Sequence, residues 1–231
     1  TAPIVVGETV YWSSRDGSVR AASLVNGKQQ WTGFTGGAVR FPPEFHLGNI
    51  YVGSGDGYVY CFDSPSGKRT WRFRAAPGQR RIAVHGELLS TWPVGSGVLV
   101  RQGVVYAAAG ITSYDGTHVY ALDAATGKIR WQNNASGHLV DDQQVTGISV
   151  QGHLLWHANR LYMAGGNVVS PATYDPVTGK CLNELANEWW NRPDDAAEVF
   201  PSRPQKDMFQ RAPRGRELFV VDNEVRVFDQ L

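Results

Sequence analysis

The amino-acid sequence predicts an all-β fold: a β-propeller of four-stranded antiparallel blades, with about four complete blades and part of a fifth. Three observations lead to this class. The 231-residue chain is rich in turn-forming and aromatic residues, with 26 Gly, 8 Trp and 9 Tyr. Short runs of alternating apolar and polar residues, bounded by turn signals, are typical of strands with one buried face. One segment of the chain also recurs at intervals that suit a blade.

The recurring segment is clearest at 119–131, which reads VYALDAATGKIRW. Earlier copies lie at 59–71 and 19–31, a weaker copy begins at Thr173, and we align a fifth from Val225. The glycines of the Gly-Lys pairs are separated by 40, 60 and 52 residues. Since a blade needs about 40 residues, the longer spacings contain insertions. We place the blades at about 1–40, 41–95, 96–150, 151–200 and 201–231 (partial).

Each part of the repeat has a predicted structural role. Asp16-Gly17 and Asp56-Gly57 are hairpin signals, because Gly tolerates the positive φ of a type I′ turn. The Gly-Lys pair forms a second tight turn, and the Trp four residues after that Gly is placed to pack across the seam between blades. Asn183 stands where the fourth Trp is expected. The predicted docking motif comprises Gly27, Trp31, Gly67, Trp71, Gly127, Trp131 and Gly179.

The segment 121–131 has the pattern A-x-D-x-x-T-G-K-x-x-W, and the chain resembles the pyrroloquinoline-quinone (PQQ)-like propeller family over nearly its whole length. The stretch 73–100 resembles an insertion in propellers of large bacterial proteins, notably of planctomycetes. The resemblance implies one of two functions. Quinoprotein dehydrogenases of the family bind PQQ and calcium, whereas the propeller lipoprotein of outer-membrane protein assembly is non-catalytic. Because both branches share the fold, the fold does not choose between them.

The dehydrogenase branch implies a vicinal Cys-Cys pair, oxygen ligands for calcium and an Asp base. The two cysteines, Cys61 and Cys181, are far apart, and Cys61 occupies a small-residue position in a predicted strand. We interpret the carboxylate pairs 141–142 and 194–195 as solvated loop residues, and we expect no zinc at His153 and His157. The sequence therefore assigns no catalytic, cofactor-binding or metal residue.

Candidate binding residues lie in the insertions, because loops on a rigid scaffold carry function. The first insertion, 75–93, and the third, 183–216, contain the candidate surface; the second covers 132–151. That surface comprises Arg80, Arg81, Glu87, Trp92, Trp189 and Trp190. Two alternatives stay open: Arg80 and Glu87 as an ion pair that braces the loop, and one of the paired tryptophans as a displaced seam residue.

The net charge of +1 gives no electrostatic case for nucleic acid. No apolar stretch reaches the roughly 20 residues that span a membrane. The chain begins at Thr1 without a signal-like segment, which indicates a processed protein or a piece of a longer one. The resemblance implies a periplasmic or extracytoplasmic location.

These observations favour a non-catalytic scaffold or binding module without a cofactor, rather than an enzyme. The alternative is a fragment of a dehydrogenase that depends on PQQ and calcium. An open propeller would expose strand edges, which proteins normally avoid. We therefore expect a protein partner, or the remaining blades of a parent chain, to cover the open side.

Overall fold

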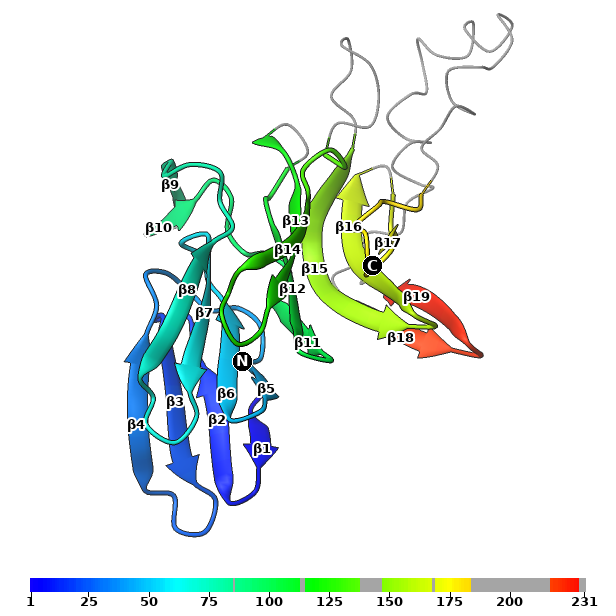
Figure 1. The fold of residues 1–231 in the computed structure, drawn as a ribbon. Helices are drawn as coiled ribbons and strands as arrows, with labels where there is room; N and C mark the ends of the chain where they lie inside the picture. The colour runs from blue at the N-terminus through cyan, green and yellow to red at the C-terminus, as the bar shows by residue number, and fades with distance from the viewer. Residues whose placement is uncertain (85, 113–114, 138–146, 168, 184–216, 229–231) are drawn as a thin grey trace, which may run out of the picture.

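The computed structural model describes residues 1–84, 86–112, 115–137, 147–167, 169–183 and 217–228. This part of the chain contains nineteen β-strands and no α-helix. The sheets follow one another along an arc that does not close (Figure 1). The predicted all-β propeller class is confirmed.

Three of the sheets are four-stranded antiparallel meanders, in which each strand pairs with the next one in the chain. The first contains β1 (Ile4–Val6), β2 (Thr9–Ser13), β3 (Ser18–Ser23) and β4 (Gln29–Phe34). The second contains β5 (Glu44–His46), β6 (Asn49–Gly53), β7 (Tyr58–Asp63) and β8 (Arg69–Arg74). The third contains β11 (Val98–Arg101), β12 (Val104–Ala109), β13 (His118–Asp123) and β14 (Ile129–Asn133).

The remaining sheets are smaller. The fourth blade has three strands, and a single bridge between Tyr174 and Cys181 follows them. Its strands are β15 (Ile148–His157), β16 (Arg160–Asn167) and β17 (Ala172–Tyr174). Two hairpins complete the described fold. They are β9 (Arg81–Val84) with β10 (Glu87–Ser90), and β18 (Glu217–Val221) with β19 (Glu224–Phe228).

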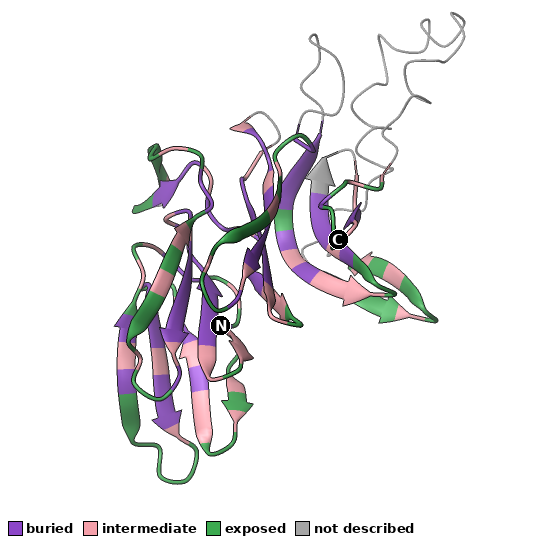
Figure 2. Cartoon of the chain, viewed as in Figure 1, coloured by how far each residue is buried: buried purple, intermediate pink, exposed green. Residues whose placement is uncertain are grey.

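The first strands of successive blades contact one another from the second blade onward. Strand β5 contacts β11, β11 contacts β15, and β15 contacts β18. The last strands, β4, β8 and β14, are more exposed than the third strands, β7 and β13, which are buried (Figure 2). Apolar side chains fill the spaces between successive blades and form three cores. The core is thus distributed over the seams, and each blade is stabilised by its neighbours.

The turn between the second and third strands differs from the prediction. The Gly17 amide donates to the Ser14 carbonyl at 3.1 Å, and the Ser14 amide donates to the Ser18 carbonyl at 2.9 Å. Gly17 has a φ of +81°, but Asp16 does not have a positive φ. This is a type I turn followed by a left-handed glycine bulge, and not a type I′ turn.

Two-residue turns with a positive φ at both positions instead join the first and second strands. They occur at Leu47-Gly48, Gln102-Gly103, Ala158-Asn159 and Asp222-Asn223. Because β18 also contacts β15 as a first strand does, β18 and β19 are the first two strands of the fifth blade. The alignment of the segment from Val225 with the third strand of the repeat was therefore wrong, since Val225 lies on a second strand.

Candidate functional site

At the seam between the first two blades, the ring of Trp31 packs against a turn of the second blade. The indole N–H of Trp31, on β4, donates to the carbonyl of Ser64 at 2.7 Å. Gly67, in the same turn as Ser64, has a φ of +69°, and a Cβ there would lie 2.5 Å from the Trp31 ring. The ring therefore needs glycine at position 67 for two reasons, backbone conformation and space.

The next two seams repeat this geometry. Trp71 donates to the carbonyl of Ala124 at 3.0 Å, and Trp131 donates to that of Pro176 at 2.8 Å. A Cβ at Gly127 or Gly179 would lie within 2.8 Å of the corresponding ring. The same ring contact thus recurs at all three seams between the first four blades.

Sequence reasoning missed a second donor at each seam. Tyr11, Tyr51 and Tyr106 lie on the second strands, and their hydroxyls donate to the carbonyls that the tryptophans use, at 3.4, 3.1 and 3.4 Å. Each tyrosine ring lies about 6 Å from the tryptophan of its own blade. The signal was present, because each of the first four copies of the repeat has an aliphatic residue followed by Tyr at this place.

The fourth blade departs from the pattern. The Asn183 side chain accepts from the Thr173 amide at 2.7 Å and donates to the Pro171 carbonyl at 3.3 Å. Asn183 is thus bonded within its own blade. Trp189 and Trp190 lie outside the described residues.

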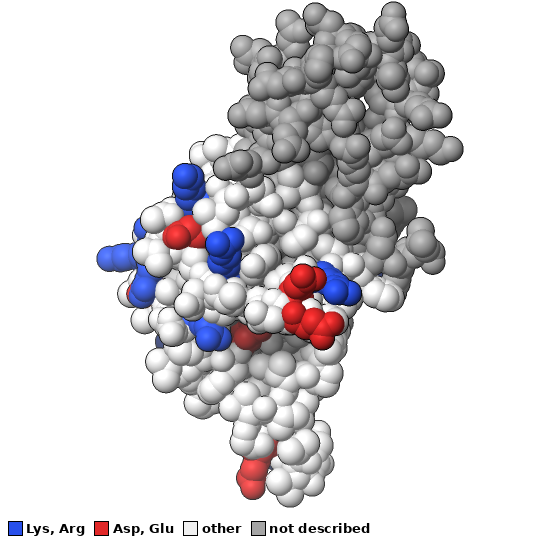
Figure 3. Space-filling view, turned by 90° about the vertical axis from the view of Figure 1, so that its right-hand side faces the viewer, with Lys and Arg blue, Asp and Glu red and all other residues white. Residues whose placement is uncertain are grey.

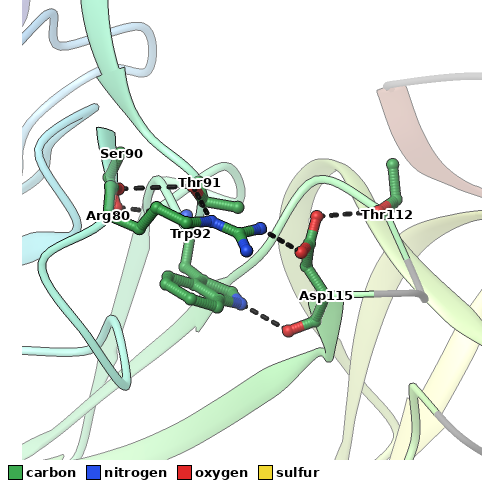
Figure 4. Close-up of polar contacts among 6 residues, drawn as sticks. All are labelled: Arg80, Ser90, Thr91, Trp92, Thr112 and Asp115. Carbon is green, nitrogen blue, oxygen red and sulfur yellow. Dashed lines mark hydrogen bonds and ion pairs between the residues drawn. The ribbon is translucent and has the colours of Figure 1, made fainter. Parts of the chain in front are cut away.

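The first insertion forms a hairpin that projects beyond the end of the second blade (Figure 1). The guanidinium of Arg80 pairs with the carboxylate of Asp115 in the third blade, and its Nε donates to Thr91 Oγ1 at 3.0 Å. The guanidinium carbon also lies 5.1 Å from the centre of the Trp92 ring, a cation–π contact. Trp92 in turn donates its indole N–H to the backbone carbonyl of Asp115 (Figure 4). We call these four residues the hairpin brace.

A second set of contacts holds the opposite side of the hairpin. Glu87 lies 3.8 Å from the guanidinium of Arg40, and the Ser90 amide donates to the Gly55 carbonyl at 2.9 Å. Leu89 is buried, and a Cβ at Gly55 would lie 2.8 Å from its side chain. The alternative of an Arg80–Glu87 ion pair is wrong, because these residues pair with Asp115 and Arg40 instead.

The pairing register separates the two faces of the hairpin. Leu88 lies opposite Ala83, and Ser90 lies opposite Arg81, so these four side chains share one face. Leu89 lies on the other face and is buried, and Ser90 is buried too, so the exposed part of the first face, its outward face, comprises Arg81, Ala83 and Leu88. Leu88 is 64% exposed, and Arg81 and Ala83 are exposed too. Of the predicted surface, Arg80, Glu87 and Trp92 hold the hairpin, whereas Arg81 faces outward.

The face of the molecule in Figure 3 has no continuous patch of positive or negative charge. Lysine and arginine side chains stand there in small separate groups with acidic ones.

His153 and His157 contact the fifth blade. His153 Nε2 lies 3.1 Å from the Leu218 carbonyl, and His157 Nε2 lies 3.1 Å from that of Asn223. The carboxylates at 141–142 and 194–195 lie outside the described residues.

Among the described residues, the two cysteines do not form the vicinal pair that the dehydrogenase branch implies. Cys61 lies in β7 opposite Tyr51 and Trp71, in the core between the second and third blades, and burial raises the pKa of its thiol. Cys181 pairs with Tyr174 at the edge of the fourth blade and contacts the Asn183 carboxamide at 3.7 Å. Within the described ranges, no three His, Cys, Asp or Glu side chains gather as metal ligands do. No helix in the same ranges is long and apolar enough to cross a membrane.

Known proteins resemble the chain in sequence and in fold. It is 24% identical over 227 residues to lupanine 17-hydroxylase [cytochrome c] of a Pseudomonas species, covering 71% of this chain and 33% of that protein. It is 27% identical over 160 residues to outer membrane protein assembly factor BamB of Bordetella pertussis, covering 58% and 41%. The crystal structure of quinohemoprotein alcohol dehydrogenase from Comamonas testosteroni matches with a TM-score of 0.64 at 20% identity, covering 78% and 33%.

The chain therefore spans about a third to two fifths of the length of these relatives. The model of one family, described as outer membrane protein assembly factor BamB, matches residues 40–192. That match covers most of the chain and includes three of the four Gly-Lys turns. The chain belongs to this family of PQQ-type β-propellers.

Proposed function

We propose that the chain is a non-catalytic β-propeller scaffold or binding module within a larger extracytoplasmic protein or complex. The observation that carries this proposal is the braced hairpin. Contacts from the third blade and from the 35–41 segment hold it on both sides, while its outward face stays exposed. A rigid scaffold that presents exposed side chains is the arrangement that binding proteins use. The extracytoplasmic placement rests on the family description.

The proposal extends to the open end of the arc. On β18 and β19, Phe219 is 37% exposed and Phe228 is 48% exposed, and their ring centroids lie 6.3 Å apart. The corresponding side of the second blade, which includes Tyr51, is covered by the third blade. We infer that further blades of a parent chain, or a protein partner, cover these rings.

A second candidate function is a fragment of a quinoprotein dehydrogenase that depends on PQQ and calcium. The matches to lupanine 17-hydroxylase and to quinohemoprotein alcohol dehydrogenase favour it. Because Cys61 is buried in a seam core, the cysteine pair beside the quinone would have to come from outside the described residues.

Addition of PQQ and calcium to the purified chain, and to a parent protein that contains its remaining blades, separates the two functions. The binding-module proposal predicts no stoichiometric quinone absorbance band and no dye-linked oxidation of alcohols. A known quinoprotein dehydrogenase, reconstituted under the same conditions, is the positive control. A stoichiometric band together with alcohol oxidation would replace the proposal by the enzyme.

A further inference from the structure

We propose that the outward face of the β9–β10 hairpin docks an extended segment of a partner protein that presents a carboxylate beside an apolar side chain. This inference rests on the proposed binding function and names its partner class. It divides the candidate surface into residues that support the hairpin and residues that contact the partner.

The ion pairs already made around the hairpin indicate which charge a partner should carry. Arg80 pairs with Asp115, and Glu87 pairs with Arg40, so the charges on either side of the hairpin are matched within the chain. Arg81 is exposed, and the described residues offer it no ion-pair partner. A guanidinium binds a carboxylate through two parallel hydrogen bonds, which gives geometric as well as electrostatic selectivity.

The apolar part of the face lies on the neighbouring strand. Leu88 is 64% exposed, and the exposed side chain of Ala83 lies directly opposite it in the pairing register. Opposed residues on one face of an antiparallel pair have Cβ atoms about 5 Å apart. A ligand side chain of aliphatic or aromatic type would bury Leu88 and Ala83 together, next to the Arg81 head group.

The size of the face limits the ligand. The exposed part of the hairpin is longest along β9, which has four residues, and a strand rises about 3.3 Å per residue. The face is therefore about 13 Å long, which suits a short extended segment of about four or five residues. The brace holds the hairpin in place before binding, so little conformational entropy is lost when the segment docks.

Selection from a displayed library of random short peptides, with the wild-type chain immobilised, tests the proposal. We expect enriched peptides to carry Asp or Glu next to an aliphatic or aromatic residue. Binding should weaken at least about tenfold for Arg81→Glu and for Leu88→Ser, which corresponds to about 1.4 kcal/mol. It should also weaken as the salt concentration rises, because the contact is partly ionic and exposed.

Two variants in the first blade serve as matched controls. Arg15→Glu makes the same charge change at an exposed arginine that has no ion pair with any described residue, and Leu24→Ser makes the same apolar change at a residue that is 55% exposed. Both should bind the selected peptides as the wild type does. The thermal unfolding midpoint of each variant shows whether it is folded.

Three outcomes would overturn the proposal: no enrichment, enrichment without acidic residues, or peptides that bind Arg81→Glu as tightly as the wild type. Peptides that bind both Arg81→Glu and Leu88→Ser as they bind the wild type would show a binding site outside the hairpin. The proposed binding function would then still hold. The PQQ titration, in contrast, contradicts the function without reference to the hairpin.

Discussion

Trp31 and Ser64 connect the first two blades through one hydrogen bond, from the indole N–H to the backbone carbonyl at 2.7 Å. The hydroxyl of Tyr11 donates to the same oxygen. One carbonyl of the second blade therefore accepts from two rings of the first. Since the seams contain the core of the molecule, this contact links local turn geometry to the stability of the whole arc.

Removal of the Trp31 ring should destabilise the chain strongly. We expect Trp31→Ala to lower the free energy of unfolding by about 3–5 kcal/mol, because the ring is buried and its loss leaves a cavity. Trp31→Phe should cost less, since part of the ring volume remains. Urea unfolding measures both. Phe34→Ala, at a side chain that is 66% exposed on the same strand, should change stability by no more than about 0.5 kcal/mol. Equal losses at the two positions would contradict the seam.

A pair of glycines separates backbone strain from seam contact. Gly27 and Gly67 both have a φ of +69°, but a Cβ meets nothing within 4 Å at Gly27 and meets the Trp31 ring at Gly67. Gly27→Ala should cost about 1–2 kcal/mol, the strain of a left-handed residue. Gly67→Ala should cost about 1–3 kcal/mol more, because the ring has to move. The comparison uses urea unfolding, and identical losses would mean that the ring does not constrain this turn.

Loss of the brace should loosen the hairpin without unfolding the propeller. We expect Asp115→Asn to speed hydrogen exchange in the segment 80–92, because it removes the charged partner of Arg80. The free energy of global unfolding should fall by no more than about 1 kcal/mol, as for other exposed ion pairs. Arg20→Gln, which breaks the exposed pair with Asp16 in the first blade, is the control and should leave exchange in 80–92 unchanged. Unchanged exchange in Asp115→Asn would show that the ion pair does not hold the hairpin.

Acid should destabilise the chain through carboxylates in the turns. Hydrogen bonds from Arg130 and Thr126 lower the pKa of Asp123 to about 2, and backbone and hydroxyl donors lower that of Asp175. A carboxyl whose pKa is lower in the folded state stabilises the fold above its unfolded pKa. That contribution is lost as the pH falls from about 4 towards 2. The free energy of unfolding should therefore fall less steeply with decreasing pH for Asp123→Asn than for the wild type. An identical pH dependence in the variant would contradict this role of Asp123.

The repeat allowed the architecture to be predicted because its signals are local. The Gly-Lys turn indicates two adjacent strands of one blade. The Trp four residues after its Gly indicates which side chain packs on the next blade. The turn at Asp16-Gly17 was predicted in the right place with the wrong geometry. Its dipeptide is compatible both with a type I′ turn and with a type I turn plus a bulge, and the backbone hydrogen bonds of Ser14 distinguish them.

The contacts that the sequence could not predict join distant residues. Arg80 pairs with Asp115, which is 35 residues away in the next blade, whereas Glu87 was the nearer acidic residue in the sequence. The fifth blade was aligned one strand out of place, because Asp222-Asn223 resembles the Asp-Gly of the other turn. Only the positive φ at both residues and the contact of β18 with β15 show which turn it is.

Hydrogen exchange in the isolated chain tests most directly the central claim that this is a propeller segment with an open seam. The account predicts that amides of 217–228, where Phe219 and Phe228 are exposed, exchange at least about tenfold faster than those of 58–63, which are buried between two blades. Equally slow exchange in the two segments of a monomer would contradict it, because the fifth blade would then be complete without a further blade or a partner.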